Sequence, residues 1–289
     1  MNNLIQHTLL GPEISIKPPF WYPGSKKSAA ASIIRLVPQK TKTVLSPFIG
    51  GGAVELSLTV QNVKVHGSDL YEPLINCWKF LLEDSKKLSD WCKQKLHSVS
   101  REELINEIHN QNNVSDFERA GYQWLKYSLN LRGIVARKNL LFYEIRKNGD
   151  AYLVAKKGSS GCRLTNFYNL ASFSNPFLSV EHGDFEAILK KYPDWFVYLD
   201  PPYYGMSAVT YGDDKIYDKE FDHEHLAYVL HKRETPFLLS YSNHEVIRSL
   251  YPESDFDWSS QSWQQRNAVG KTISNEILIR PRKYLSYWS

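Results

Sequence analysis

The residues best suited to chemistry are Asp200-Pro201-Pro202-Tyr203, which directly follow the apolar and aromatic run of residues 195–199. That run has the length and composition of a buried strand. The two prolines end the strand, because neither can donate a ladder hydrogen bond. In an open α/β sheet, ligands bind at the carboxyl ends of the strands. The sequence therefore predicts that a carboxylate, a rigid turn and an aromatic ring lie together at a binding site.

This group of residues suits an exocyclic amine such as that of adenine, whose lone pair is delocalised into the ring. The Asp200 carboxylate and the Pro201 carbonyl could each accept one amine hydrogen, which would draw the nitrogen toward tetrahedral geometry. Tyr203 offers a ring face on which a base could stack. The alternative is a structural strand end with Asp200 as a turn former. Four residues alone do not decide between these interpretations.

A glycine-rich loop earlier in the chain has the layout of a nucleotide-binding turn. Residues 43–48 are typical of a short buried strand, residues 49–53 contain three consecutive glycines, and a helix is expected from residue 54 to about 59. Glycines allow backbone to approach a ligand closely. The pattern is not G-x-G-x-x-G, because Glu55 occupies the last glycine position. This argues against a dinucleotide pyrophosphate site.

Two acidic residues at expected strand ends each have two open interpretations. Asp69 ends an expected strand over residues 63–69, so it could hold ribose hydroxyls or cap the helix that begins near Tyr71. Asp184 opens a later helix and could cap it or accept a hydrogen bond from an adenine amino group. The neighbouring Phe185 could pack on a ring.

The segment Gly24-Ser25-Lys26 precedes a helix expected to run through Arg35. It is not a P-loop, because the required glycine and the G-K pair are absent. Ser25 could cap the helix. Alternatively, the backbone amides of this turn and Lys26 could face a carboxylate at the helix start.

The middle of the chain is predicted to be an inserted, mostly helical unit with a basic end. The helical patterns of residues 72–130 are too many for one βα crossover, and residues 131–157 carry seven basic residues against two acidic ones. A basic, Asn-bearing hairpin suits phosphate contacts and the reading of base edges, whereas a solvated basic loop is the alternative. We expect a target-recognition insert over residues 75–160 and a catalytic domain over residues 1–74 and 161–289. The residues expected to contact DNA are Arg132, Arg137, Lys138 and Asn139.

Composition indicates a globular protein of 289 residues, with 42% hydrophobic residues and a net charge of +4. The absence of a long apolar run and of a signal-peptide pattern near Met1 predicts a cytoplasmic location with no membrane association. The three cysteines contain no C-x-x-C pair, so free thiols are expected. The pair His223-x-His225 lacks accompanying ligands, so no metal site is predicted.

Taken together, the motifs resemble those of the Dam-like (alpha-group) DNA adenine-specific methyltransferases. The resemblance covers residues 17–284, with the cofactor motifs first, the target-reading insert next and the catalytic motif after it. The matching segments are Phe20-Trp21-Tyr22-Pro23-Gly24-Ser25-Lys26, Pro47-Phe48-Ile49-Gly50-Gly51-Gly52, Asp69, Gly183-Asp184-Phe185, Asp200-Pro201-Pro202-Tyr203, Ser240-Tyr241-Ser242-Asn243 and Glu276-Ile277-Leu278-Ile279.

The resemblance implies a Rossmann-like S-adenosylmethionine-dependent methyltransferase fold with a helical and β-hairpin target-recognition insert. It implies methyl transfer from S-adenosylmethionine to the exocyclic amine of a flipped adenine in duplex DNA. Asp200, Pro201, Pro202 and Tyr203 would hold the target base. The residues that would bind the cofactor are Trp21, Gly24 and Lys26 at its methionine end, Phe48, Gly50 and Gly52 in the main loop, Asp69 at the ribose, and Asp184 with Phe185 at the adenine.

Several alternatives remain open at the level of sequence. The same chemistry could act on the exocyclic amine of cytosine, or the chain could be a catalytically silent DNA-binding module of the same fold. The insert after residue 142 departs from the family pattern, so the recognition sequence is not predicted. Double-stranded DNA is the expected partner, a cognate restriction endonuclease could accompany the chain, and a monomer or weak dimer is expected.

Overall fold

The computed structural model of the chain describes residues 18–20, 22–129, 143–148, 151–156, 162–163, 170–205, 221–267 and 270–288.

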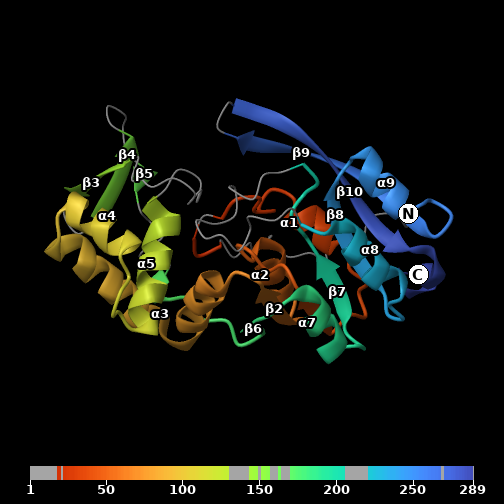
Figure 1. Cartoon of the computed structure of the whole chain (residues 1–289), viewed down its shortest axis with the longest axis horizontal. Helices are drawn as coiled ribbons and strands as arrows, with labels where there is room; N and C mark the ends of the chain where they lie inside the picture. The colour runs from red at the N-terminus through yellow and green to blue at the C-terminus, as the bar shows by residue number, and fades with distance from the viewer. Residues whose placement is uncertain are drawn as a thin grey trace, which may run out of the picture.

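A seven-stranded sheet organises this part of the chain, with the strand order β6-β2-β1-β7-β8-β10-β9 (Figure 1). Its strands are β1 (Thr43–Ser46), β2 (Lys64–Asp69), β6 (Leu178–His182), β7 (Phe196–Leu199), β8 (Phe237–Ser242), β9 (Phe256–Asn267) and β10 (Gly270–Pro281). The first five strands in this order are parallel, whereas β10 is antiparallel to both β8 and β9. The chain order reverses between β1 and β7, which is the switch point where doubly wound sheets bind ligands. The predicted Rossmann-like α/β fold is confirmed.

Helices cover both faces of this sheet, so its central strands are apolar on both sides. One face is covered by α1 (Ala30–Ile34), α2 (Ala53–Thr59) and α3 (Glu72–Ser98), and the other by α7 (Phe185–Lys191), α8 (His223–His231) and α9 (Glu245–Leu250). Alternate residues of β7 enter the two cores. Phe196 and Tyr198 pack with the first set of helices, and Val197 and Leu199 pack with the second. This two-sided burial explains the continuous apolar run before Asp200.

A helical layer and a small second sheet lie at the opposite end of the molecule from β8–β10 (Figure 1). They comprise α3, α4 (Arg101–His109) and α5 (Asp116–Leu129), followed by β3 (Tyr143–Asn148), β4 (Ala151–Lys156) and β5 (Cys162–Arg163), which form an antiparallel sheet in the order β3-β4-β5. A capping box begins α4, because Ser100 Oγ accepts from the Glu103 backbone N–H while the Glu103 carboxylate accepts from the Ser100 N–H.

The N-terminal segment ties the helical layer to the main sheet. Trp124 of α5 donates from Nε1 to the Pro19 carbonyl at 3.1 Å, and the Phe20 ring stacks on Tyr127 with a centroid distance of 5.1 Å. Phe20 also meets Trp78 of α3 edge-on at 5.1 Å. Residue 75, the predicted start of the insert, lies inside α3. The division of the chain into a catalytic domain and an insert stays a prediction.

The two C-terminal strands, β9 and β10, are long, with 12 residues each. Much of their length is rich in Ser, Gln and Asn, which give no apolar alternation to indicate a strand. Helix α9 and the 3₁₀ segment η4 (Arg282–Trp288) were also not predicted.

None of the helices described is long and apolar enough to cross a membrane. Cys77 and Cys92 are buried free thiols. Within the described ranges, no three His, Cys, Asp or Glu side chains gather as metal ligands would.

Candidate active site

The Asp200-Pro201-Pro202-Tyr203 segment lies at the carboxyl edge of the main sheet, immediately after β7. Its strand is flanked by β1 and β8, so the segment stands beside the switch point. The Tyr203 hydroxyl is 3.3 Å from Ser240 Oγ on β8, which fixes the outer end of its side chain. The structure thus presents the carboxylate, the rigid turn and the ring at the edge where the sequence predicted them.

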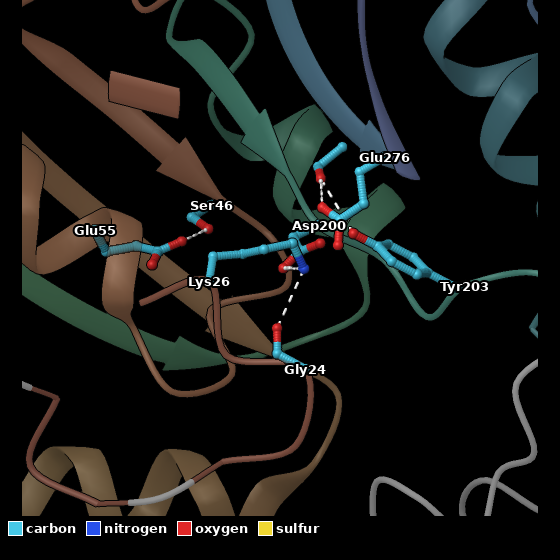
Figure 2. Close-up of polar contacts among 8 residues, drawn as sticks. Gly24, Lys26, Ser46, Glu55, Asp200, Tyr203 and Glu276 are labelled. Carbon is cyan, nitrogen blue, oxygen red and sulfur yellow. Dashed lines mark hydrogen bonds and ion pairs between the residues drawn. The ribbon is translucent and has the colours of Figure 1, made fainter. Parts of the chain in front are cut away.

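Lys26 is paired with Asp200 across 174 positions of sequence (Figure 2). Its Nζ donates to Asp200 Oδ2 at 2.8 Å and to the Gly24 carbonyl at 3.2 Å. The same Nζ lies 4.8 Å from the centre of the Tyr203 ring, within cation–π range. Lys26 is only 5% exposed. A lysine expected at the cofactor therefore contacts the residues expected to hold the target base.

Two further acidic side chains lie around the pair of Lys26 and Asp200. Neither had a role predicted from the sequence. Glu55 in the first turn of α2 is 3% exposed and accepts from Ser46 Oγ at 2.6 Å. Glu276 of β10 is 1% exposed, and Ser240 Oγ donates to its Oε2 at 3.4 Å. The only sequence signal was an acid within an otherwise apolar helix or strand. Figure 2 shows both carboxyl groups directed toward the region around Lys26 and Asp200.

Burial shifts the protonation of these acids toward neutral pH. It raises the pKa of Asp200 to about 6, an effect opposed by the positive charge of Lys26 and reinforced by Glu276. Burial raises the pKa of Glu55 to about 7, against the hydrogen bond from Ser46. Asp200 is therefore mostly a carboxylate at pH 7 and becomes protonated as the pH falls through about 6.

The glycine loop between β1 and α2 is held in place by Asp69 at the end of β2. Asp69 Oδ2 accepts from the Gly50 N–H at 3.2 Å, and Oδ1 accepts from the Tyr71 N–H at 3.0 Å at the start of α3. Trp78 Nε1 donates to the Gly50 carbonyl at 2.9 Å. Asp69 thus joins the loop to the start of α3. The N-cap of α3 is Tyr71, with no side-chain cap, so the interpretation of Asp69 as the helix cap is wrong.

Two of the loop glycines are required by backbone conformation and by packing. Gly50 has φ +47° and Gly52 has φ +68°, in the left-handed region that favours glycine. A Cβ on Gly50 would lie 2.9 Å from the Tyr22 ring, and one on Gly52 would lie 2.8 Å from the Trp78 ring. Protein side chains fill the spaces that these glycines leave open, so the loop is shaped by its own neighbours as well as by any ligand.

An aromatic group stands beside this loop, formed by Phe48, Phe185 and Phe221. Their ring centroids are 5.6 to 6.0 Å apart. Asp184 caps α7 by accepting from the Glu186 N–H at 2.9 Å, as one interpretation of the sequence proposed. The structure therefore brings the rings of Phe48 and Phe185 together, with Asp184 next to Phe185 at the start of α7.

The turn before α1 had two interpretations from the sequence, and the structure contradicts one of them. The helix begins at Ala30 with Ala29 at the N-cap position and no side-chain cap, so the interpretation of Ser25 as its cap is wrong. Instead Gly24, with φ +74°, turns the backbone so that its carbonyl receives Lys26 Nζ. Trp21, Arg132, Arg137, Lys138 and Asn139 lie outside the described residues, and their expected roles stay predictions.

Comparison with known proteins gives a family match over most of the chain. Residues 22–267 match the family of D12 class N6 adenine-specific DNA methyltransferases. The chain is 25% identical over 216 residues to the type II methyltransferase M1.LlaDCHI of Lactococcus lactis subsp. cremoris, covering 72% of each protein.

Among solved structures, the chain resembles the precorrin-6y C5,15-methyltransferase of Geobacter metallireducens GS-15. The TM-score is 0.39 at 9% identity, covering 94% of this chain and 98% of the other. It also resembles a precorrin 8w decarboxylase of Methanobacterium thermoautotrophicum, with a TM-score of 0.34 at 10% identity, covering 94% of this chain and 99% of the other.

Proposed function

Because the chain belongs to the D12 class N6 adenine-specific DNA methyltransferase family, we propose that it moves a methyl group from S-adenosylmethionine to a flipped-out adenine in duplex DNA. The family match makes the chain an adenine-specific DNA methyltransferase. We propose in addition that S-adenosylmethionine is the methyl donor and that the adenine is flipped out of the duplex. The observation that carries it is the Asp200-Pro201-Pro202-Tyr203 segment at the carboxyl edge of the sheet, beside the switch point.

The charge of the site fits S-adenosylmethionine, whose sulfonium is cationic. Three carboxyl groups, those of Glu55, Asp200 and Glu276, lie around the ammonium of Lys26 (Figure 2). An excess of carboxylates favours a positively charged ligand. We propose that Gly50 and Gly52 form the cofactor loop, that Asp69 lies near the ribose, and that the Phe48, Asp184 and Phe185 group receives the adenine ring. Trp21 and Gly24 would lie at the methionine end.

In the proposed reaction, the protein supplies orientation and hydrogen-bond acceptors, while the cofactor supplies an electrophilic methyl group. Asp200 and the Pro201 carbonyl each accept a hydrogen of the adenine amine, which exposes the nitrogen lone pair. Pro202 keeps the turn rigid, and Tyr203 stacks on the base that has left the helix. Bound S-adenosylmethionine would supply the methyl group to this nitrogen and leave as S-adenosylhomocysteine, and the extra proton of the methylated amine would pass to solvent.

We propose that the helical layer and the β3–β5 sheet form the target-recognition unit, within the predicted insert 75–160. Arg132, Arg137, Lys138 and Asn139 would contact DNA from there. The name of the Lactococcus relative, a type II methyltransferase, supports a partnership with a restriction endonuclease of the same specificity. A monomer could modify its site one strand at a time, and a cytoplasmic location would give it access to DNA.

The test is methyl transfer by the purified Asp200→Ala variant. We expect the rate on duplex DNA to fall by about 100-fold or more, because an acceptor for the reacting amine is lost. Cofactor affinity, measured by calorimetry, should stay within a few-fold of the wild type. The matched control is Asp194→Ala, since Asp194 is an exposed acid at the other end of the same strand. Parallel loss of cofactor binding in Asp200→Ala would place this residue in the cofactor site instead.

A further inference from the structure

The ammonium of Lys26 is committed to the chain's own residues. It donates to Asp200 and to the Gly24 carbonyl, and it lies over the Tyr203 ring (Figure 2). The family resemblance would place this side chain at the methionine end of the cofactor. Two of its three contacts are instead with residues proposed to hold the target base.

We propose that Lys26 is a positioning residue for the target base, which keeps Asp200 an oriented carboxylate, and that it is not a ligand of the cofactor. The proposal rests on the proposed function, because it requires Asp200 to accept hydrogens of the reacting amine. It assigns to the N-terminal turn a part in methyl transfer that is separate from cofactor binding.

A buried carboxylate needs a compensating charge, and Lys26 is the cation that contacts Asp200. The titratable groups that face Asp200 from the surrounding elements are Lys26 of the N-terminal turn, Glu55 of α2, Tyr198 of β7, Tyr203 of the catalytic segment, Tyr241 of β8 and Glu276 of β10. Burial raises the pKa of Asp200, and Lys26 lowers it. Without the ammonium, the remaining groups in this set are all acids, so the pKa of Asp200 would rise further and it would take up a proton more readily. It would then offer an O–H donor where the amine needs an acceptor.

The geometry also leaves acceptor capacity on Asp200. Lys26 Nζ binds Oδ2, and its second bond, to the Gly24 carbonyl, fixes the ammonium in the turn. Asp200 Oδ1 has no hydrogen-bond partner in the described part of the chain. A carboxylate offers about four lone-pair positions, so the pair with Lys26 leaves positions for the amine hydrogens.

The experiment compares Lys26→Met, Lys26→Arg and the adjacent control Lys27→Met, since Lys27 is exposed. Methyl transfer to DNA is followed from pH 5 to 9 at saturating cofactor, and cofactor affinity is measured separately by calorimetry. In the wild type, we expect the rate to fall as the pH drops through about 6, when Asp200 is protonated. We call this fall the acidic limb of the pH–rate profile. In Lys26→Met the pH at which the rate falls should be higher by about 1 to 3 units, because the neighbouring cation is lost.

Recovery of the Lys26→Met rate at high pH, with a cofactor Kd within a few-fold of the wild type, would support the proposal. Lys26→Arg, which keeps the charge, should restore the limb toward its wild-type position, and Lys27→Met should leave it unchanged. An unmoved limb together with a tenfold weaker cofactor would overturn the proposal and make Lys26 a cofactor ligand.

A second readout does not depend on methyl transfer. The carboxyl of Asp200 can be titrated by NMR in protein labelled with ¹³C-aspartate, with Asp200→Asn identifying its signal. A higher pKa in Lys26→Met than in the wild type would support the charge role even if no DNA were methylated. An inactive wild type would therefore count against the proposed function alone, whereas an unchanged pKa would count against the role of Lys26.

A different observation concerns the hairpin of β9 and β10, which extends past the sheet (Figure 1). β10 pairs with β8 only through Glu276–Ile279, where Glu276 is opposite Ser242 at the carboxyl end of β8. Residues 270–275 pair with residues 262–267 alone. Because β10 is antiparallel to β8, this free ribbon projects beyond the edge that carries Asp200. Six residues of strand span about 20 Å.

The sequence of the free ribbon is suited to a polyanion. Arg266 and Lys271 are at paired positions of the β9–β10 ladder. Residues 259–275 contain these two basic residues and no acidic residue, so this stretch has a net positive charge. The same stretch contains five Gln or Asn residues, whose amides suit base edges and phosphates.

We infer that this ribbon is a second DNA-contacting element, in addition to the predicted insert. In Figure 1, the ribbon and the β3–β5 sheet both lie toward the top of the view, on opposite sides of the molecule. DNA that reaches Asp200 must approach the carboxyl edge from which the ribbon projects. This inference also rests on the proposed function, since it takes duplex DNA as the substrate.

The test is DNA binding by the double variant Arg266→Gln/Lys271→Gln across a range of salt concentrations. The slope of log K against log salt should become shallower by up to about two units, because two phosphate contacts are lost. The control is Lys190→Gln. Lys190 is an exposed residue near the end of α7, which runs from Asp184 back toward the opposite edge of the sheet.

An unchanged slope in the double variant, with wild-type DNA binding intact, would overturn the ribbon inference. Absence of DNA binding by the wild type itself would contradict the proposed function instead. The melting temperature of the double variant is measured beside that of the wild type. An unchanged value would show that weaker DNA binding does not come from unfolding.

Discussion

At the scale of single residues, the site depends on charges that are close in space and distant in sequence. The Asp-Pro-Pro-Tyr segment could be located from sequence, because an apolar strand followed by two prolines marks a strand end. The partner of Asp200 could not be located in this way, since Lys26 is 174 positions away. For the same reason, no place in the site could be predicted for Glu55 or Glu276. A single acid in an apolar stretch gives no sign of the lysine that it will face.

A residue-scale prediction concerns Tyr203, whose ring and hydroxyl have separable contacts. Tyr203→Ala should lower kcat/KM on duplex DNA by about 5- to 100-fold, the effect of losing one base-stacking contact. Tyr203→Phe keeps the ring and loses the contact with Ser240, so its kcat/KM should stay within a few-fold of the wild type. Steady-state kinetics on a duplex with one target site gives both values. If the Ala and Phe variants had equal rates, the ring would not act by stacking.

At the scale of elements, the central strands β1 and β7 could be predicted because their apolar runs are buried on both faces. The β9–β10 hairpin could not, because the polar residues of its outer half carry no such pattern. The glycine loop was predicted at its correct place between β1 and α2. The reason for its glycines was incomplete, because the rings of Tyr22 and Trp78 occupy the space beside Gly50 and Gly52.

The loop supports an element-scale prediction on stability. Gly52→Ala should lower the free energy of unfolding by about 2 kcal/mol or more, from left-handed backbone strain together with the contact of the new Cβ with Trp78. Gly205→Ala is a matched control, because Gly205 has φ +75° and a new Cβ there would have no atom of the described residues within 4 Å. It should cost only the strain, about 1 kcal/mol. Urea unfolding measures both variants, and equal losses would show that packing against Trp78 has no part in the effect.

At the scale of the whole molecule, the catalytic edge lies between two structural parts that come from different stretches of the sequence. The helical layer with the β3–β5 sheet comes from the middle of the chain, and the β9–β10 ribbon comes from its end (Figure 1). The helical layer with its small sheet could be predicted from the sequence through its surplus of helical patterns and basic residues. The ribbon could not be predicted, because only the ladder register shows where it leaves the sheet.

The central claim is that this chain methylates adenine in DNA through Asp200. It is tested most directly by modification-sensitive long-read sequencing of DNA from a host that lacks adenine methylation, expressing either the wild type or Asp200→Ala. We predict N6-methyladenine at one short motif with the wild type and none with the variant. Unmodified adenine in both samples, or methylation that persists in the variant, would contradict the account.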